Sequence, residues 1–145
     1  MPEARFTVIT LGVAQVGAAA AFYERLGFAR RLRATGEEVA FFETGASVIA
    51  LYPWDKLAAE AGLAEAPRPA AFRGIVLAWN CNSRADVDAA LAQAAAAGAR
   101  VIKPAQATEY GGYAGYFCDP DGHVWEAVTA PGLTVAPDGR LDVPE

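Results

Sequence analysis

GGYAGYFCDPDGHVWEAV, at residues 111–128, holds two strand-like runs on either side of a turn. The runs, at 113–118 and 123–129, are rich in aromatic and β-branched residues, which favour strands. Between them, the DPDG sequence at 119–122 supplies the aspartate, proline and glycine that tight turns favour. This stretch therefore predicts a β-hairpin.

Outward from this hairpin, the chain runs twice through one order of strand, helix and three strands. The first copy is predicted at 5–13, 15–26, 28–34, 38–43 and 47–52. The second is predicted at 72–80, 84–97, 99–103, 113–118 and 123–129. Both helices stop at a glycine, Gly27 and Gly98, and Ser83 with Asp86 forms a variant capping box before the second helix. The repeat predicts an α+β fold of paired βαβββ modules that form one curved mixed sheet, with the helices on its convex face.

The length of 145 residues and the hydrophobic share of 54% fit one domain, which we place at 1–132. The expected parts are a module at about 5–52, a connector at 53–71, a module at about 72–129 and an irregular tail at 133–145. Within the connector, WDKLAAEAG predicts a short helix.

The charge and the apolar pattern exclude several classes of protein. With 17 acidic against 12 basic residues the formal charge is −5, which argues against a nucleic-acid partner. No apolar run reaches the ~18 residues of a membrane span, and the N-terminus lacks a signal-peptide pattern. We therefore expect a cytoplasmic protein with no membrane partner, in which Cys81 and Cys118 are reduced core residues.

Alternation along the strands sorts side chains onto two faces of the predicted sheet. One set is large and apolar and suits packing under helices: Ile9, Leu11, Val13, Ile75, Leu77 and Trp79. The other set is smaller and mixed, with Thr10, Ala50 and Gly74. This second face predicts a concave, partly solvated pocket, with a tightly packed second layer as the alternative.

Three segments carry a family resemblance: ITLGVAQVGAAAAFYERLGF, SRADVDAALAQAAAAGARVIKPA and GGYAGYFCDPDGHVWEAV. Together they resemble the vicinal oxygen chelate superfamily, the group of glyoxalases, bleomycin-resistance proteins and extradiol dioxygenases, over about residues 5–130. The resemblance implies paired βαβββ modules, in agreement with the repeat, and a homodimer.

The chemistry of that superfamily uses a divalent metal held by side chains from the first and last strands of both modules. The matching positions in this chain are Val8, Ala50, Gly74 and Glu126. Three of these have no donor atom in the side chain, whereas catalytic metal sites generally use three protein ligands. We therefore expect the fold without the metal, and no cofactor.

The last predicted hairpin carries two polar residues, His123 and Glu126, that could take part in a site. His123 and Glu126 are an odd number of residues apart on one strand and so point to opposite faces, which argues against a shared metal. His123 is expected to order the turn or to lie partly exposed. Glu126 is either a functional carboxylate on a pocket floor, acting as proton acceptor or ligand partner, or a relic satisfied by a tyrosine or an arginine.

Aromatic residues surround the same region. Tyr110, Tyr113 and Tyr116 alternate with glycines and predict a loop that covers a ligand, and Trp54 is expected at the same mouth. The alternative is that these rings fill a subunit interface or cover a sheet edge. Trp79 and Trp125 fall on the helix-packing face and are assigned to the core.

Three hypotheses for function follow. The first is a metal-independent protein that binds an aromatic or cationic small molecule beneath the Tyr110–Tyr113 loop, in a cleft lined by Phe6, Thr10, Tyr52, Phe72 and Glu126. The second is an enzyme with lactoylglutathione-lyase-like, isomerase or dioxygenase-like activity, through a rebuilt metal site or with Glu126 as base. The third is a structural or regulatory dimer whose cleft is filled.

Overall fold

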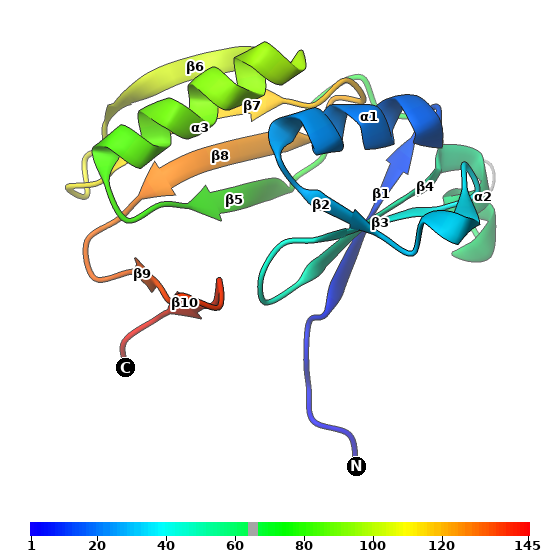
Figure 1. The fold of residues 1–145 in the computed structure, drawn as a ribbon, viewed down its shortest axis with the longest axis horizontal. Coiled ribbons are helices and arrows are strands. Elements are labelled where there is room, and N and C mark those ends of the chain that lie inside the picture. The colour runs from blue at the N-terminus through cyan, green and yellow to red at the C-terminus, as the bar shows by residue number, and fades with distance from the viewer. Residues whose placement is uncertain (64–66) are drawn as a thin grey trace. The chain divides into compact units, whose positions relative to one another are not determined.

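The computed structural model describes residues 1–63 and 67–145. The chain divides into two compact units, Met1–Pro69 and Ala70–Glu145. Each unit contains one strand–helix–strand–strand–strand module (Figure 1). The division falls inside the connector expected at 53–71.

The first unit is built on a four-stranded sheet. Its elements are β1 (Val8–Val13), α1 (Val16–Leu26), β2 (Ala29–Arg31), a 3₁₀ turn (Arg33–Thr35), β3 (Ala40–Glu43), β4 (Val48–Pro53) and α2 (Trp54–Glu60). The strand order is β1-β4-β3-β2, with β1 parallel to β4 and the other pairs antiparallel.

The helix α1 packs on the apolar face of this sheet. It stops at Gly27, which takes the left-handed conformation (φ 106°) that glycine adopts without strain. Tyr23 is fully buried and its ring lies 5.0 Å from that of Phe22 and 5.8 Å from that of Phe42 on β3. Burial of such rings supplies much of the hydrophobic stabilisation of this unit.

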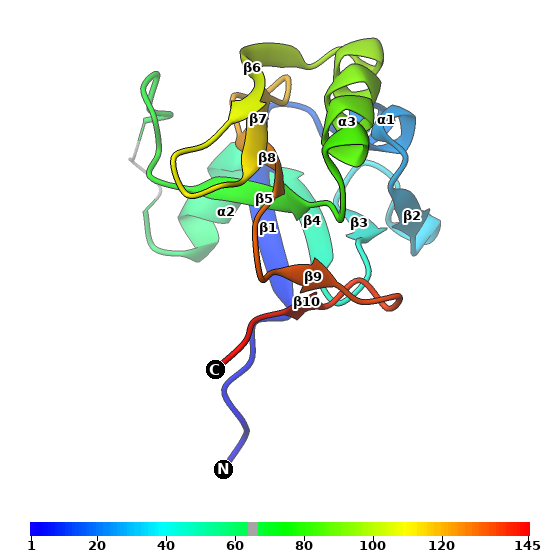
Figure 2. The same cartoon turned by 90° about the vertical axis from the view of Figure 1, so that its left-hand side faces the viewer.

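The second unit repeats the plan. Its elements are β5 (Val76–Asn80), α3 (Arg84–Ala97), β6 (Arg100–Ala107), β7 (Tyr113–Cys118), β8 (Val124–Thr129), β9 (Thr134–Val135) and β10 (Leu141–Asp142). The main sheet has the order β5-β8-β7-β6, with β5 parallel to β8, and β9 pairs with β10. Figure 2 shows α3 lying along one side of this sheet, where it contacts β6, β7 and β8.

The core of the second unit lies between α3 and the sheet. Phe117 and Trp125 stack there with nearly parallel rings, 6.0 Å between centroids. Gly115 allows the helix to come close, because a Cβ at that position would lie 2.4 Å from Cδ1 of Leu91. Trp125 is therefore a core residue as expected, while Trp79 is half-buried on the same face of the sheet.

The predicted α+β fold of paired βαβββ modules is confirmed, and so is the short helix in the connector. Ser83 caps α3 as expected, since its Oγ accepts the backbone N–H of Asp86 at 3.1 Å. Cys81 and Cys118 are free and buried. No helix in the described ranges 1–63 and 67–145 has both the length and the apolar character needed to cross a bilayer.

The structure differs from the predicted fold in its sheets, in the start of β5 and in the tail. Backbone pairing among the described residues gives two four-stranded sheets instead of one, because β1 and β5 each pair with a single neighbour. β5 begins at Val76 and not at 72, since Gly74 takes a positive φ of 80° that breaks the strand. The tail is not wholly irregular, because β9 and β10 form a short hairpin in it.

Candidate functional site

A single row of side chains crosses the sheet of the second unit. The strand register places Ala78 of β5 beside Glu126 of β8, Glu126 beside Tyr116 of β7, and Tyr116 beside Lys103 of β6. Residues directly opposite each other in a sheet point to the same face. We call these four residues the Glu126 row.

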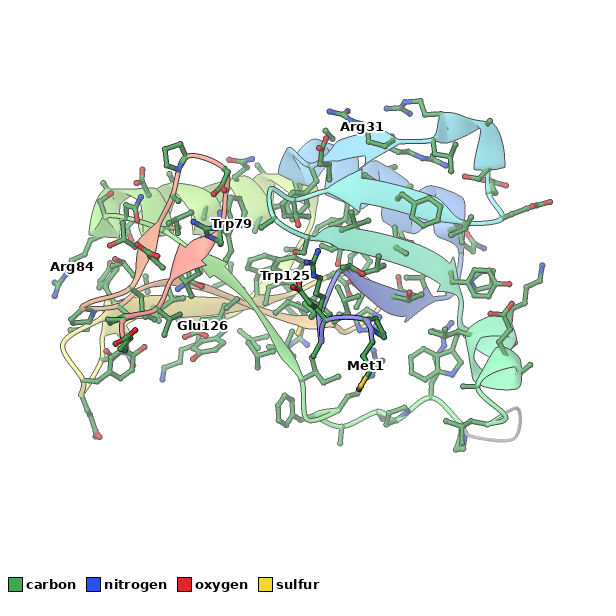
Figure 3. All side chains as sticks on the ribbon, turned by 90° about the horizontal axis from the view of Figure 1, so that it is seen from below. Met1, Arg31, Trp79, Arg84, Trp125 and Glu126 are labelled. Carbon is green, nitrogen blue, oxygen red and sulfur yellow. The ribbon has the colours of Figure 1, made fainter. Side chains whose placement is uncertain are left out.

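The Glu126 row lies on the face of the sheet away from α3. Trp125 and Phe117, the chain neighbours of Glu126 and Tyr116, are buried on the α3 side, and successive residues of a strand point to opposite faces. Figure 3 shows Glu126 and Trp125 on this sheet. Glu126 is half-buried, as expected for a residue on a partly solvated face.

A hydrogen bond joins the two central members of the row. The Tyr116 hydroxyl donates to Oε1 of Glu126 at 3.0 Å in a part-buried setting. Burial raises the pKa of the Tyr116 phenol, and the bond to Glu126 raises this pKa further. The phenol therefore stays protonated and holds one carboxylate oxygen of Glu126 in place. A tyrosine was one of the two partners that the sequence analysis expected for Glu126.

The flanking residues make the two ends of the row chemically different. Ala78 is exposed and small, so the sheet carries little side-chain bulk on that side of Glu126. Lys103 is exposed at the other end and brings a positive charge next to Tyr116. The row therefore offers a carboxylate acceptor and an ammonium donor on one face.

Tyr110 lies near this row. It sits 58% exposed in the turn between β6 and β7, and its ring packs over Gly112, where a Cβ would lie 2.6 Å from Cε2 of Tyr110. After burial and the bond to Glu126, an electrostatic contribution from Tyr110 is the smallest cause of the raised pKa of Tyr116. The glycine in the turn thus lets the tyrosine ring fold back on the sheet.

Tyr113 lies on the opposite face from Glu126, which corrects its assignment to a lid over that residue. Its hydroxyl donates to Oδ1 of Asp88 on α3 at 2.9 Å, and the Arg84 guanidinium lies 5.0 Å from its ring centroid. Because Tyr113 and Tyr116 are three residues apart on β7, they point to different faces. Alternation along the strand, applied to the tyrosines, would have given this result.

The other expected pocket residues divide between the units. Thr10 and Tyr52 share one face of the first sheet, because the register pairs Thr10 with Ala50 and Gly12 with Tyr52. The Tyr52 hydroxyl donates to Oε1 of Glu60 at 2.9 Å, and this bond raises the pKa of the phenol.

Phe6 and Phe72 do not lie in strands. Phe6 precedes β1 and is 69% exposed, and Phe72 precedes β5 and is 68% exposed. The sheet faces predicted for them do not apply, because both strands begin later than the sequence pattern indicated.

His123 orders the turn before β8, as expected. Its Nδ1 lies 3.2 Å from Nη1 of Arg73, whose Nη2 donates to the carbonyl oxygen of Asp121 at 2.9 Å. Arg73 therefore braces the turn and takes no part in the Glu126 row.

The first-strand residues that match the superfamily's metal positions occupy equivalent places before the helices of the two modules. Val8 lies eight residues before the start of α1, and the residue eight before the start of α3 is Val76. The position matched to Gly74 therefore shifts to Val76, which has no donor atom either. Val8, Ala50 and Val76 offer hydrocarbon only, so these residues do not fit a divalent metal. In the part of the chain that the structure describes, no three His, Cys, Asp or Glu residues gather as metal ligands.

The sequence matches the Glyoxalase/Bleomycin resistance protein/Dioxygenase superfamily over residues 5–127. The chain belongs to this superfamily. A comparison with curated proteins gives no match.

One solved structure gives the same assignment, and two others share the fold. A glyoxalase-related enzyme from Fulvimarina pelagi is 32% identical, with a TM-score of 0.84, and the match covers 97% of this chain and 99% of that one. A glyoxalase/bleomycin resistance protein/dioxygenase family enzyme from Burkholderia phytofirmans is 22% identical, with a TM-score of 0.76 and coverage of 86% and 97%. A lactoylglutathione lyase from Agrobacterium tumefaciens, at 23% identity and a TM-score of 0.65 with coverage of 89% and 96%, shares the fold.

Proposed function

We propose that this protein binds a small organic molecule on the sheet face that carries the Glu126 row, without the metal of its superfamily. The observation that carries this proposal is that the carboxylate of Glu126 is half-buried and held in one orientation. Glu126 is the one residue with a donor side chain among the four matched positions, and Tyr116 holds its carboxylate through a hydrogen bond. A half-buried, oriented carboxylate is suited to recognise a ligand by a charge-assisted hydrogen bond.

The row also defines the class of ligand. Glu126 and Lys103 lie on strands two apart, which corresponds to about 9–10 Å between their backbones. A matching ligand has a cationic or N–H donor group for Glu126 and an acceptor group for Lys103. Its central part is apolar or aromatic, to lie over the Tyr116 ring.

Calorimetric titration of a panel of cationic glycopeptides and aromatic metabolites tests the proposal. Glu126→Gln is expected to weaken binding by about 10- to 100-fold, because hydrogen bonds to charged groups contribute ~1.5–3 kcal/mol. Glu109→Gln serves as the control, because it removes the same charge from an exposed position of the second unit. Absence of binding across the panel, or equal loss in both variants, would contradict the proposal.

We also propose that the protein is a homodimer in the cytoplasm and has no nucleic-acid or membrane partner. The homodimer follows from the superfamily resemblance, and the net charge of −5 opposes binding to polyanions. Light scattering coupled to size-exclusion chromatography measures the oligomeric state directly.

Enzymatic activity is the second candidate. The Tyr116–Glu126 hydrogen bond favours it, because an oriented carboxylate can serve as a general base. The Fulvimarina pelagi and Agrobacterium tumefaciens proteins, described as an enzyme and as a lactoylglutathione lyase, support the same direction. Metal analysis of the purified protein, with assays of lyase turnover, separates the candidates. A stoichiometric metal lost in Glu126→Ala, or turnover lost in Glu126→Gln, would favour the enzyme.

A further inference from the structure

In the first unit, Gly12 leaves room for the indole of Trp54 to lie against the backbone of β1. Trp54 is the first residue of α2, directly after β4. A Cβ at Gly12 would lie 2.8 Å from Cε3 and 3.3 Å from Cδ2 of Trp54, so the indole lies against the bare backbone of β1. Gly12 is the register partner of Tyr52, and the indole therefore shares the sheet face of Tyr52 and Thr10.

A guanidinium group already lies over this ring. Cζ of Arg68 is 5.5 Å from the centroid of the Trp54 ring, within the range of a cation–π interaction. Tryptophan is the strongest aromatic partner for a cation, and arginine the most frequent cation partner. Arg68 itself is exposed, whereas Trp54 is half-buried.

A carboxylate, that of Glu60, belongs to the same helix as Trp54. Glu60, on the same helix α2, accepts the hydroxyl of Tyr52 on the sheet face that Trp54 covers. The face therefore combines a π surface with a carboxylate, which favours a planar cation over a neutral ring or an anion.

We propose that the face of Trp54 is a binding site for a planar organic cation, such as an aromatic amidinium or a guanidinium, and that Arg68 is its competing intramolecular occupant. The site lies in the first unit and uses no member of the Glu126 row. The proposal therefore does not rest on the function proposed above.

The exposure of Arg68 makes the competition measurable. Exposed cation–π pairs are weak, and the loss of one changes an equilibrium by about 2- to 5-fold. An external cation must displace Arg68 before it stacks on Trp54. Removal of Arg68 is therefore expected to strengthen binding of the external cation by about the same factor.

Benzamidinium is a suitable probe, with benzamide as its neutral isostere, and ligand-observed NMR titration gives the affinities. We expect Arg68→Ala to bind benzamidinium about 2- to 5-fold more tightly than the unmodified protein. Arg5→Ala, which removes an equal charge from an exposed position of the same unit, should bind it unchanged. Trp54→Leu should lose the binding, and Trp54→Phe should weaken it while keeping an aromatic ring for the fold.

Three results would overturn the proposal. These are equal affinity of Arg68→Ala and the unmodified protein, equal binding of benzamide and benzamidinium, and undiminished binding in both Trp54 variants. Glu126→Gln probes the Glu126 row, whereas Arg68→Ala and the two Trp54 variants probe residues of the first unit. Failure of this site and failure of the Glu126 row are therefore distinguishable.

Discussion

The side chain of Asp119 accepts the backbone N–H of His123 at 2.8 Å, across the turn that joins β7 to β8. The same atom, Oδ1, also accepts the N–H of Asp121 at 2.9 Å, and the Asp119 N–H donates to the carbonyl oxygen of His123. Asp119 is buried, with 4% of its surface exposed. This closed turn fixes the register in which Tyr116 faces Glu126, so the geometry of the candidate site depends on it.

Asp119→Ala is expected to lower the free energy of unfolding by about 2–6 kcal/mol, because two N–H groups lose their acceptor at a cost of ~1–3 kcal/mol each. The control is Asp138→Ala, because exposed Asp138 accepts the N–H of Arg140 two residues on, as Asp119 accepts that of Asp121. Asp138→Ala should lower the free energy of unfolding by no more than about 0.5 kcal/mol, because the residue is exposed. Urea unfolding measures both. Equal effects would show that burial of the Asp119 carboxylate does not matter.

The phenol of Tyr116 should titrate above the ordinary tyrosine pKa of about 10. Burial raises its pKa first, and the hydrogen bond to Glu126 adds to this. Subtraction of the tyrosinate absorbance of Tyr116→Phe from that of the unmodified protein isolates this group. Glu126→Gln should move the transition to lower pH, although not to the ordinary value, because the burial remains. A transition at or below the ordinary value would contradict the assignment.

The same shift affects stability in alkali. A group whose pKa is raised in the folded state stabilises the protein fully below its unfolded pKa, and this contribution is lost as the pH rises through the folded pKa. The free energy of unfolding of the unmodified protein should therefore fall above about pH 10. Tyr116→Phe should show a smaller fall over that range in denaturant titrations at stepped pH.

The N-cap of α3 contributes to the stability of the second unit. Ser83 accepts the N–H of Asp86 through Oγ, so Ser83→Ala should lower the free energy of unfolding by ~1 kcal/mol. Ser83→Gly should cost only a few tenths of a kcal/mol, since glycine is itself favoured at a helix N-cap. Thermal or urea unfolding of the pair separates loss of the cap from general damage, and an inverted order would contradict it.

Element order and capping could be predicted from sequence because their causes are local. Gly27 and Gly98 end their helices in the left-handed conformation, as their positions indicated. The start of β5 was predicted too early, because the apolar run from Phe72 gives no sign that Gly74 adopts a positive φ. Strand ends depend on backbone angles that the hydrophobic pattern does not encode.

The candidate site was predictable only in part. Strand alternation placed Glu126 on the open face, but its partner Tyr116 depends on the register of β7 against β8. Lys103 depends on the pairing of β6, which is irregular on both sides of this residue. The contact of Arg68 with the ring of Trp54 is between residues fourteen positions apart, in a connector that contains proline. No periodicity of the sequence predicts such a contact.

The tail of the second unit should depend on one side chain, Asn82. Its Nδ2 donates to the carbonyl oxygen of Val135 at 3.0 Å and its Oδ1 accepts the Val135 N–H at 2.9 Å, so the amide acts as a short strand beside β9. The β9–β10 hairpin pairs only two residues on each side and is marginal alone. Asn82→Ala should therefore speed hydrogen exchange of the Val135 amide by up to about tenfold.

Asn82→Asp provides the graded comparison for this test. It keeps the acceptor for the Val135 N–H but replaces the donor to the Val135 carbonyl with an oxygen, so exchange should rise less than in Asn82→Ala. Unchanged exchange at Val135 in Asn82→Ala would mean that β9 and β10 hold each other without this residue. A larger effect in Asn82→Asp than in Asn82→Ala would mean that repulsion between the carboxylate and the carbonyl oxygen outweighs the retained bond.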